Sequence, residues 1–99
     1  MSAEFLQQLE QIIDQRIAAG DDSSYTRRLV EQGVHKLAQK VGEEGVETAL
    51  AAVAADDGQL LEEAADLVFH LLVLLRAKNL RLSQVTELLS TRHQQKTAR

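Results

Sequence analysis

Two segments carry the clearest pattern in this chain: GVHKLAQKVGEEGVE at residues 33–47 and EEAADLVFHLLVLL at residues 62–75. In both segments apolar residues return every three or four positions, which is the spacing of one face of an α-helix. The first segment lies within a predicted helix from Thr26 to about Ala55, and Gly33 can divide this helix into a short and a long piece. The second lies within a predicted helix from about Gln59 to Lys78, whose many leucines indicate deep burial.

Acidic residues occur as two pairs on these helices, Glu44 with Glu47 and Glu63 with Asp66. Residues three positions apart lie on the same face of a helix, so both carboxylates of a pair project together. The predicted turn between the helices, at Asp56–Gly58, is short and makes the helices antiparallel neighbours. The two acidic pairs are therefore expected to face one another.

Four carboxylates gathered between apolar stripes repel one another and resist losing water unless a cation neutralises them. Oxygen ligands select hard cations, so the pattern predicts Mg²⁺, with Mn²⁺ as the alternative ion. Such an ion keeps several waters, which leaves positions for substrate phosphates and for an attacking water. The same spacing is common on ordinary solvated helices, and spacing alone leaves both interpretations open.

The N-terminal part of the chain is also predicted to be helical. Alanine, leucine, glutamate and glutamine are abundant and proline is absent from the whole sequence, which favours helix nearly everywhere. A first helix is expected from about Ala3 to Ala19, ended by Gly20. A polar connection follows, and Ser24 or Thr26 is expected to cap the next helix.

The C-terminal part is predicted to form one more helix. Asn79 is expected to stop the preceding helix, and Ser83 is expected to cap the last one, which runs to about Gln95. The tail at about 95–99 is expected to fray. The whole pattern predicts an all-α antiparallel bundle of four to five helices.

Composition limits the classes of protein. A length of 99 residues suits one domain over residues 1–99. The chain has 11 basic and 15 acidic side chains and therefore a net charge of −4. A chain this short buries only about two thirds of its unfolded surface, so association of copies is expected. The absence of cysteine excludes disulfides and thiolate metal sites. A sequence pI near 5.3 argues against nucleic-acid binding, and the apolar runs are too short for a membrane span, so a soluble cytoplasmic protein is expected.

The acidic pattern resembles that of a known group of enzymes. EEGVE at residues 43–47, followed after fifteen residues by EAAD at 63–66, resembles the E-E-x-x-E … E-x-x-D signature of the all-α nucleoside triphosphate pyrophosphohydrolases. With SYT at 24–26 and the two segments quoted first, the chain is similar over about residues 5–92 to the phosphoribosyl-ATP pyrophosphohydrolases of histidine biosynthesis. This resemblance implies an antiparallel helical bundle of that type, completed by dimerisation.

The resemblance also implies the chemistry and the site residues. It implies an enzyme that splits phosphoribosyl-ATP into phosphoribosyl-AMP and pyrophosphate by metal-activated water. Matched position by position, the metal ligands are Glu44, Glu47, Glu63 and Asp66. Glu43 matches the acid that orients or deprotonates the water, so Glu43, Glu44 and Glu47 are the expected catalytic residues. The family is dimeric or higher, with sites near the subunit interface, and the absence of cysteine and of spare length implies the form not fused to a cyclohydrolase.

Four further residues are candidates for substrate binding. Lys36 and Lys40 share a neighbouring face with the acids, where they stabilise phosphoryl charge or only form helix salt bridges. His70 lies four residues after Asp66, so it orients that acid, contacts a phosphate or fills the core. Tyr25 either contacts the ligand or packs as an ordinary ring.

Gly42 and Gly45 lie beside the acids within a predicted helix. A glycine inside a helix costs about 1 kcal/mol relative to alanine. This cost predicts a compensating close approach by another helix or by the substrate.

Three functions remain in view. The first is the hydrolysis of phosphoribosyl-ATP, with a small-molecule nucleotide and further copies of the chain as partners, and with neither nucleic acid nor membrane. The second keeps the chemistry but changes the substrate, as in housecleaning hydrolases of nucleoside triphosphates. The third is a non-catalytic helical module that dimerises through its leucine face. Release of pyrophosphate from phosphoribosyl-ATP but not from a panel of ordinary nucleoside triphosphates separates the first two functions. The third function predicts that chelators change nothing.

Overall fold

The computed structural model describes residues 2–19 and 24–97, and within these ranges it contains five helices and no strand. The helices are α1 (Ser2–Ala19), α2 (Tyr25–Glu31), α3 (Val34–Val53), α4 (Asp57–Ala77) and α5 (Leu82–Thr97). The prediction of an all-α fold is therefore confirmed. Gly20, expected to end the first helix, and most of the polar connection after it lie outside the described residues.

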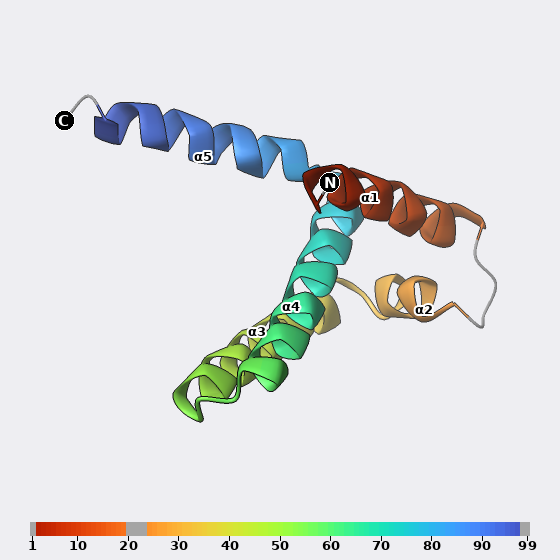
Figure 1. The fold of residues 1–99 in the computed structure, drawn as a ribbon. Helices are drawn as coiled ribbons and strands as arrows, with labels where there is room; N and C mark the ends of the chain where they lie inside the picture. Colours follow the sequence, from red (N-terminus) through yellow and green to blue (C-terminus); the bar gives the residue numbers. More distant parts are fainter. Residues whose placement is uncertain (1, 20–23, 98–99) are drawn as a thin grey trace.

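Helices α3 and α4 form an antiparallel pair that extends away from α1 towards the lower left of the view (Figure 1). Helices α1 and α2 lie towards the end of α4 that is far from the turn, and α5 extends away as an arm (Figure 1). The buried core lies where α1 to α4 meet, and its members are Ile13, Leu29, Leu37, Leu72 and Val73. Packing against α1 and α2 therefore holds one end of the α3–α4 pair, while completion of the bundle by a second copy stays a prediction.

The starts of α2 and α3 confirm two expectations from the sequence. Gly33 has φ +98°, a backbone conformation that residues with a Cβ rarely adopt, and it divides α2 from α3. Ser24 caps α2, because its Oγ accepts a hydrogen bond of 3.3 Å from the Arg27 backbone N–H.

The turn between α3 and α4 lies about two residues earlier than predicted. Helix α3 ends at Val53, and Ala55 at φ +58° reverses the chain. The N–H of Asp56 then donates to the Ala51 carbonyl at 3.3 Å, which closes a Schellman motif. The Asp56 side chain accepts from the Gln59 N–H at 3.0 Å and starts α4, so Gly58 lies inside the helix rather than in the turn.

Replacing Ala55 with Gly is expected to stabilise the protein by about 0.5–1 kcal/mol, because glycine has no Cβ to strain in the left-handed region. Urea unfolding of Ala55→Gly measures this gain. Ala54 has an ordinary helical φ of −73°, so the matched change Ala54→Gly should lower stability. Equal effects of the two substitutions would contradict the strain at Ala55.

Hydrogen bonds join the junction of α4 and α5 to α1. Asn79 at φ +63° ends α4, as expected from the sequence. Ser83 is not the cap of α5, since the helix begins at Leu82 and the Leu82 N–H donates to Glu10 Oε2 at 2.7 Å. Arg76 Nε also donates to Asp14 Oδ1 at 2.6 Å. A side chain distant in sequence thus adds to the local bond from the Arg81 N–H to Gln84 Oε1 at 2.7 Å, which the local pattern did not indicate.

Candidate metal and nucleotide site

Three of the four predicted metal ligands gather between α3 and α4. Within the described residues, one carboxylate oxygen each of Glu44, Glu63 and Asp66 lies within 4.8 Å of the other two. Glu44 comes from α3 and is only 4% exposed, whereas Asp66 is exposed and Glu63 is half-buried on α4. The structure therefore brings the two helices' acids together, as the antiparallel arrangement predicts.

The register of the turn explains this convergence. Glu44 lies eleven positions before Ala55 and Asp66 lies eleven positions after it. In an antiparallel pair joined by a turn centred on Ala55, residues equally far from the centre lie at the same height. Glu47 and Glu63, each eight positions from Ala55, are matched in the same way.

Glu47 lies at the exposed edge of this cluster. A hydrogen bond shared with Glu63 raises the pKa of Glu47 above its usual value, and the charges of Glu63 and Glu44 raise it further. The fourth acid thus contacts the cluster without being one of its three converging members.

Two buried carboxylate oxygens in the cluster accept no hydrogen bond from the described residues. Within the described part of the chain, neither Glu44 Oε2 nor Glu63 Oε2 has a hydrogen-bond partner. A buried carboxylate oxygen without a partner is unfavourable, because it has lost water and gained nothing. A hard divalent cation satisfies such oxygens, so the donor set of these acids fits the predicted kind of ion.

The two predicted lysines lie on α3 with different surroundings. Lys40 Nζ is 3.4 Å from Glu44 Oε1, and its hydrogen bond to Glu44 raises the pKa of Lys40 above its usual value. Lys36 lies one turn earlier on α3 and is exposed. Lys40 therefore contacts a candidate metal ligand directly, whereas Lys36 remains available to solvent or to a ligand.

Glu43 is not one of the three converging acids. Its carboxylate accepts a hydrogen bond of 3.1 Å from Gln39, and it lines a shallow depression on α3 with Gln39, Gly42, Val46 and Glu47. Glu43 and Glu47 thus border the same open surface beside the cluster. This placement is compatible with contact to a water or substrate that approaches from outside.

The close approach expected at the two helical glycines is absent from the described part of the chain. A Cβ added at Gly42 or Gly45 would meet no heavy atom within 4 Å. Among the described residues, the expectation that another helix of this chain approaches them closely was therefore wrong. Contact with the substrate or with a second copy stays a prediction.

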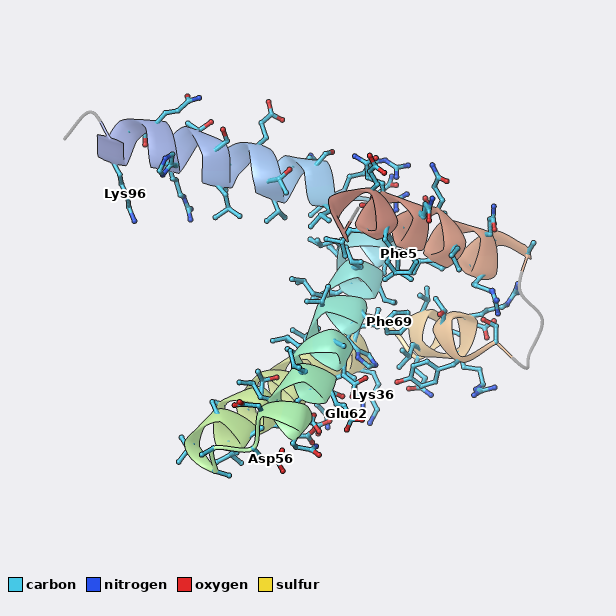
Figure 2. The ribbon with its side chains drawn as sticks, viewed as in Figure 1. Phe5, Lys36, Asp56, Glu62, Phe69 and Lys96 are labelled. Carbon is cyan, nitrogen blue, oxygen red and sulfur yellow. The ribbon has the colours of Figure 1, made fainter. Side chains whose placement is uncertain are left out.

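His70 and Tyr25 form a link between α4 and α2. His70 is 5% exposed, its Nδ1 lies 2.7 Å from the Asp66 carbonyl oxygen, and its Nε2 lies 2.8 Å from the Tyr25 hydroxyl. Because a carbonyl only accepts, Nδ1 donates to Asp66, and the tautomer with its proton on Nδ1 accepts from the Tyr25 hydroxyl at Nε2. Phe69 faces α2 from the same side of α4 (Figure 2), and its ring lies 6.4 Å from that of Tyr25.

Gln59 is a polar contact of the site that the sequence reasoning missed. Its Nε2 donates to Glu63 Oε1 at 2.6 Å from one turn earlier on α4. The sequence does contain a signal for this contact, because Gln59 precedes Glu63 by four residues, the same interval by which Lys40 precedes Glu44. Such pairs are common on helices, so the signal has meaning only once the acid is placed in a site.

In chelator, Glu47→Gln is expected to have a higher thermal midpoint than the wild type at neutral pH. The folded state raises the pKa of Glu47, so the ionised Glu47 side chain destabilises the fold. This destabilisation is complete above the raised pKa and is lost as the pH falls through it. The difference between the thermal midpoints of the variant and the wild type should therefore shrink as the pH falls from neutral towards the ordinary pKa of a glutamate. It should be small because Glu47 is exposed.

Calorimetry of both proteins across this pH range tests the expectation. Glu62→Gln removes an exposed charge from α4 outside the cluster and serves as the control. A pH-independent difference at Glu47, or an equal gain in Glu62→Gln, would contradict repulsion among the clustered acids.

Comparison with known proteins gives a consistent result. The family model for phosphoribosyl-ATP pyrophosphohydrolase matches residues 6–93. A protein named phosphoribosyl-ATP pyrophosphatase from Pyrobaculum calidifontis is 53% identical over 92 residues, which cover 93% of this chain and 98% of that protein. Proteins named histidine biosynthesis bifunctional protein HisIE, from Xanthomonas axonopodis pv. citri and Escherichia coli K12, are each 53% identical, over 92% and 91% of this chain. The chain spans only 44% of the length of each of these two bifunctional relatives.

Proposed function

The chain belongs to the phosphoribosyl-ATP pyrophosphohydrolase family, and we propose that it hydrolyses phosphoribosyl-ATP to phosphoribosyl-AMP and pyrophosphate, the second step of histidine biosynthesis. The observation that carries the proposal is the cluster of Glu44, Glu63 and Asp66 between α3 and α4. A triphosphate is a polyanion, so it approaches clustered carboxylates favourably only when a cation lies between them. We place this activity in the cytoplasm.

The proposed metal ligands are Glu44, Glu47, Glu63 and Asp66, and the proposed ion is Mg²⁺ or Mn²⁺. Support comes from the all-oxygen donor set and from the two buried carboxylate oxygens without partners in the described chain. A bound divalent ion would offset the charge of the phosphoryl oxygens and lower the pKa of a coordinated water. Within the described residues, no helix is both long and apolar enough to cross a membrane.

Glu43 and Glu47 are proposed to orient the attacking water and to accept its proton. Both line the open depression beside the cluster, so a water that enters from solvent reaches their carboxylates, which can accept its proton. In the reaction, the water oxygen forms a new bond to a phosphorus of the triphosphate chain. The bond from that phosphorus to the oxygen that joins the α- and β-phosphoryl groups breaks, and the products are phosphoribosyl-AMP and pyrophosphate.

Four residues are proposed to contact or orient the substrate. Lys36 and Lys40 would supply positive charge to the phosphoryl oxygens from the α3 side. Tyr25 is 45% exposed, so its ring can contact the nucleotide while its hydroxyl stays bonded to His70. His70 would act through this bond and through its bond to the Asp66 carbonyl.

The deciding experiment is an assay of pyrophosphate release from phosphoribosyl-ATP, with Mg²⁺ and in chelator. We expect release with Mg²⁺ and none in chelator, and much weaker release from a panel of ordinary nucleoside triphosphates. Preferential turnover of the ordinary triphosphates would instead favour a housecleaning hydrolase. No release from any nucleotide would favour the non-catalytic helical module.

We also propose that the protein is a homodimer or a higher homo-oligomer. Large apolar residues along the outer side of the α3–α4 pair are exposed, with Val46 at 60%, Leu50 at 62%, Val53 at 85% and Leu61 at 71%. A contiguous exposed apolar patch marks an interaction surface, and a second copy offers the same patch in return. Light scattering should give at least twice the 11.0 kDa chain mass, and Leu50→Lys should lower it.

A further inference from the structure

Two of the clustered acids are held in the same way. On α3, Lys40 Nζ is 3.4 Å from Glu44 Oε1, and on α4, Gln59 Nε2 donates to Glu63 Oε1 at 2.6 Å. In each case the second oxygen, Oε2, is buried without a hydrogen-bond partner among the described residues. One oxygen of each carboxylate is therefore fixed by a protein donor, and the other is left for a ligand.

We propose that Gln59 is a positioning residue of the metal site, holding Glu63 by its Oε1 so that its Oε2 stays available to the cation. This inference rests on the proposed function, because it requires that the cluster binds a divalent ion. Gln59 is itself placed by the start of α4, where its backbone N–H donates to Asp56 Oδ1 at 3.0 Å. The amide therefore extends from a fixed point in the first turn of the helix.

The antiparallel arrangement makes Lys40 and Gln59 complementary. Each lies four residues before its acid, so Gln59 lies on the side of the α3–α4 turn and Lys40 lies on the side of the core. Lys40 and Gln59 thus contact the cluster from opposite ends. Gln59 carries no charge, so it orients Glu63 without cancelling the negative charge that attracts the cation, whereas Lys40 partly offsets the charge of Glu44.

The test is the affinity of the metal-free full chain for Mn²⁺, measured at equilibrium by electron paramagnetic resonance. Gln59→Met keeps the length of the side chain and its helix propensity but removes the donor. We expect Gln59→Met to bind Mn²⁺ about tenfold more weakly, since removing a hydrogen-bond partner of a metal ligand typically costs about 10- to 100-fold and this contact is exposed. In turnover, the Mg²⁺ concentration for half-activation should rise while kcat at saturating Mg²⁺ changes little.

Gln39→Met is the matched control. Gln39 makes the same kind of bond to Glu43, at 3.1 Å, but Glu43 is not one of the three converging acids. Its Mn²⁺ affinity should equal that of the wild type. The thermal midpoint of both variants in chelator should also stay at the wild-type value, which separates positioning of the ligand from stabilisation of the helix.

Three results would count against the inference in distinguishable ways. Wild-type protein that does not bind Mn²⁺ would overturn the metal site itself, and with it the premise. Wild-type binding with equal affinity in Gln59→Met would overturn only the part assigned to Gln59. Weaker binding accompanied by an equally weakened Gln39→Met, or by a lower midpoint in chelator, would show a general effect on the helices instead.

Discussion

Glu63→Gln is expected to lower kcat for pyrophosphate release more than about a hundredfold while the helices still form. Changes to the partners of metal ligands already cost about 10- to 100-fold, and this change alters a proposed ligand itself. The amide keeps the shape of the side chain but removes the charge that attracts the cation. The metal-free fold should not suffer, because removing one of several neighbouring negative charges relieves repulsion.

Circular dichroism and a pyrophosphate assay on the same samples test both halves of this expectation. Glu44→Gln, which changes the buried acid on α3, should behave in the same way. Glu62→Gln is the matched control, because it removes the same charge from the adjacent, exposed position on α4. Full activity in Glu63→Gln or Glu44→Gln, or an equal loss in Glu62→Gln, would show that the cluster is not the catalytic site.

Thermal unfolding gives an independent measure of the same site. A cation that binds the folded chain more tightly than the unfolded chain raises the midpoint, and the stabilisation grows with the logarithm of its affinity. Mg²⁺ at millimolar concentration should therefore raise the midpoint of the wild type and of Glu62→Gln, but not that of Glu63→Gln. An unchanged wild-type midpoint would contradict a preformed cation site.

The convergence of the acids was predictable because it depends on helix periodicity more than on the turn. A turn centred on Asp57, as the sequence suggests, would set Glu44 level with His70 rather than with Asp66. The observed centre at Ala55 shifts the match by four residues, about one helical turn. Acids spaced three apart on both helices still meet after such a shift, although the partner of each acid changes.

The position of that turn could not be read from local preferences. Gly58 is the residue that best tolerates a left-handed conformation, yet the chain reverses at Ala55. The capping bonds of Asp56 at the start of α4 and at the end of α3 favour the earlier turn. Long-range contacts are hidden for the same reason, since the bond from Leu82 to Glu10 joins residues that no local pattern connects.

Leu72→Ala is expected to lower the free energy of unfolding by about 2–5 kcal/mol, the range for removing a buried leucine side chain. Leu72 is 1% exposed and belongs to the core cluster in which α1 to α4 meet. A domain of this size has only about 5–15 kcal/mol of total stability, so the loss is a large share of it. Because this junction fixes the base of the α3–α4 pair, the acid cluster loses its support when the core is weakened.

Leu72→Ala should therefore lower the thermal midpoint by at least about 8 °C, since each kcal/mol shifts the midpoint of such a domain by about 4–8 °C. Activity at a temperature where the variant remains folded should change little, because Leu72 contacts the core and not the acids. Leu89 on α5 is 56% exposed, so Leu89→Ala should change stability by no more than about 0.5 kcal/mol. Equal destabilisation by the two substitutions would place the principal core elsewhere, because burial at the four-helix junction is the reason for the difference.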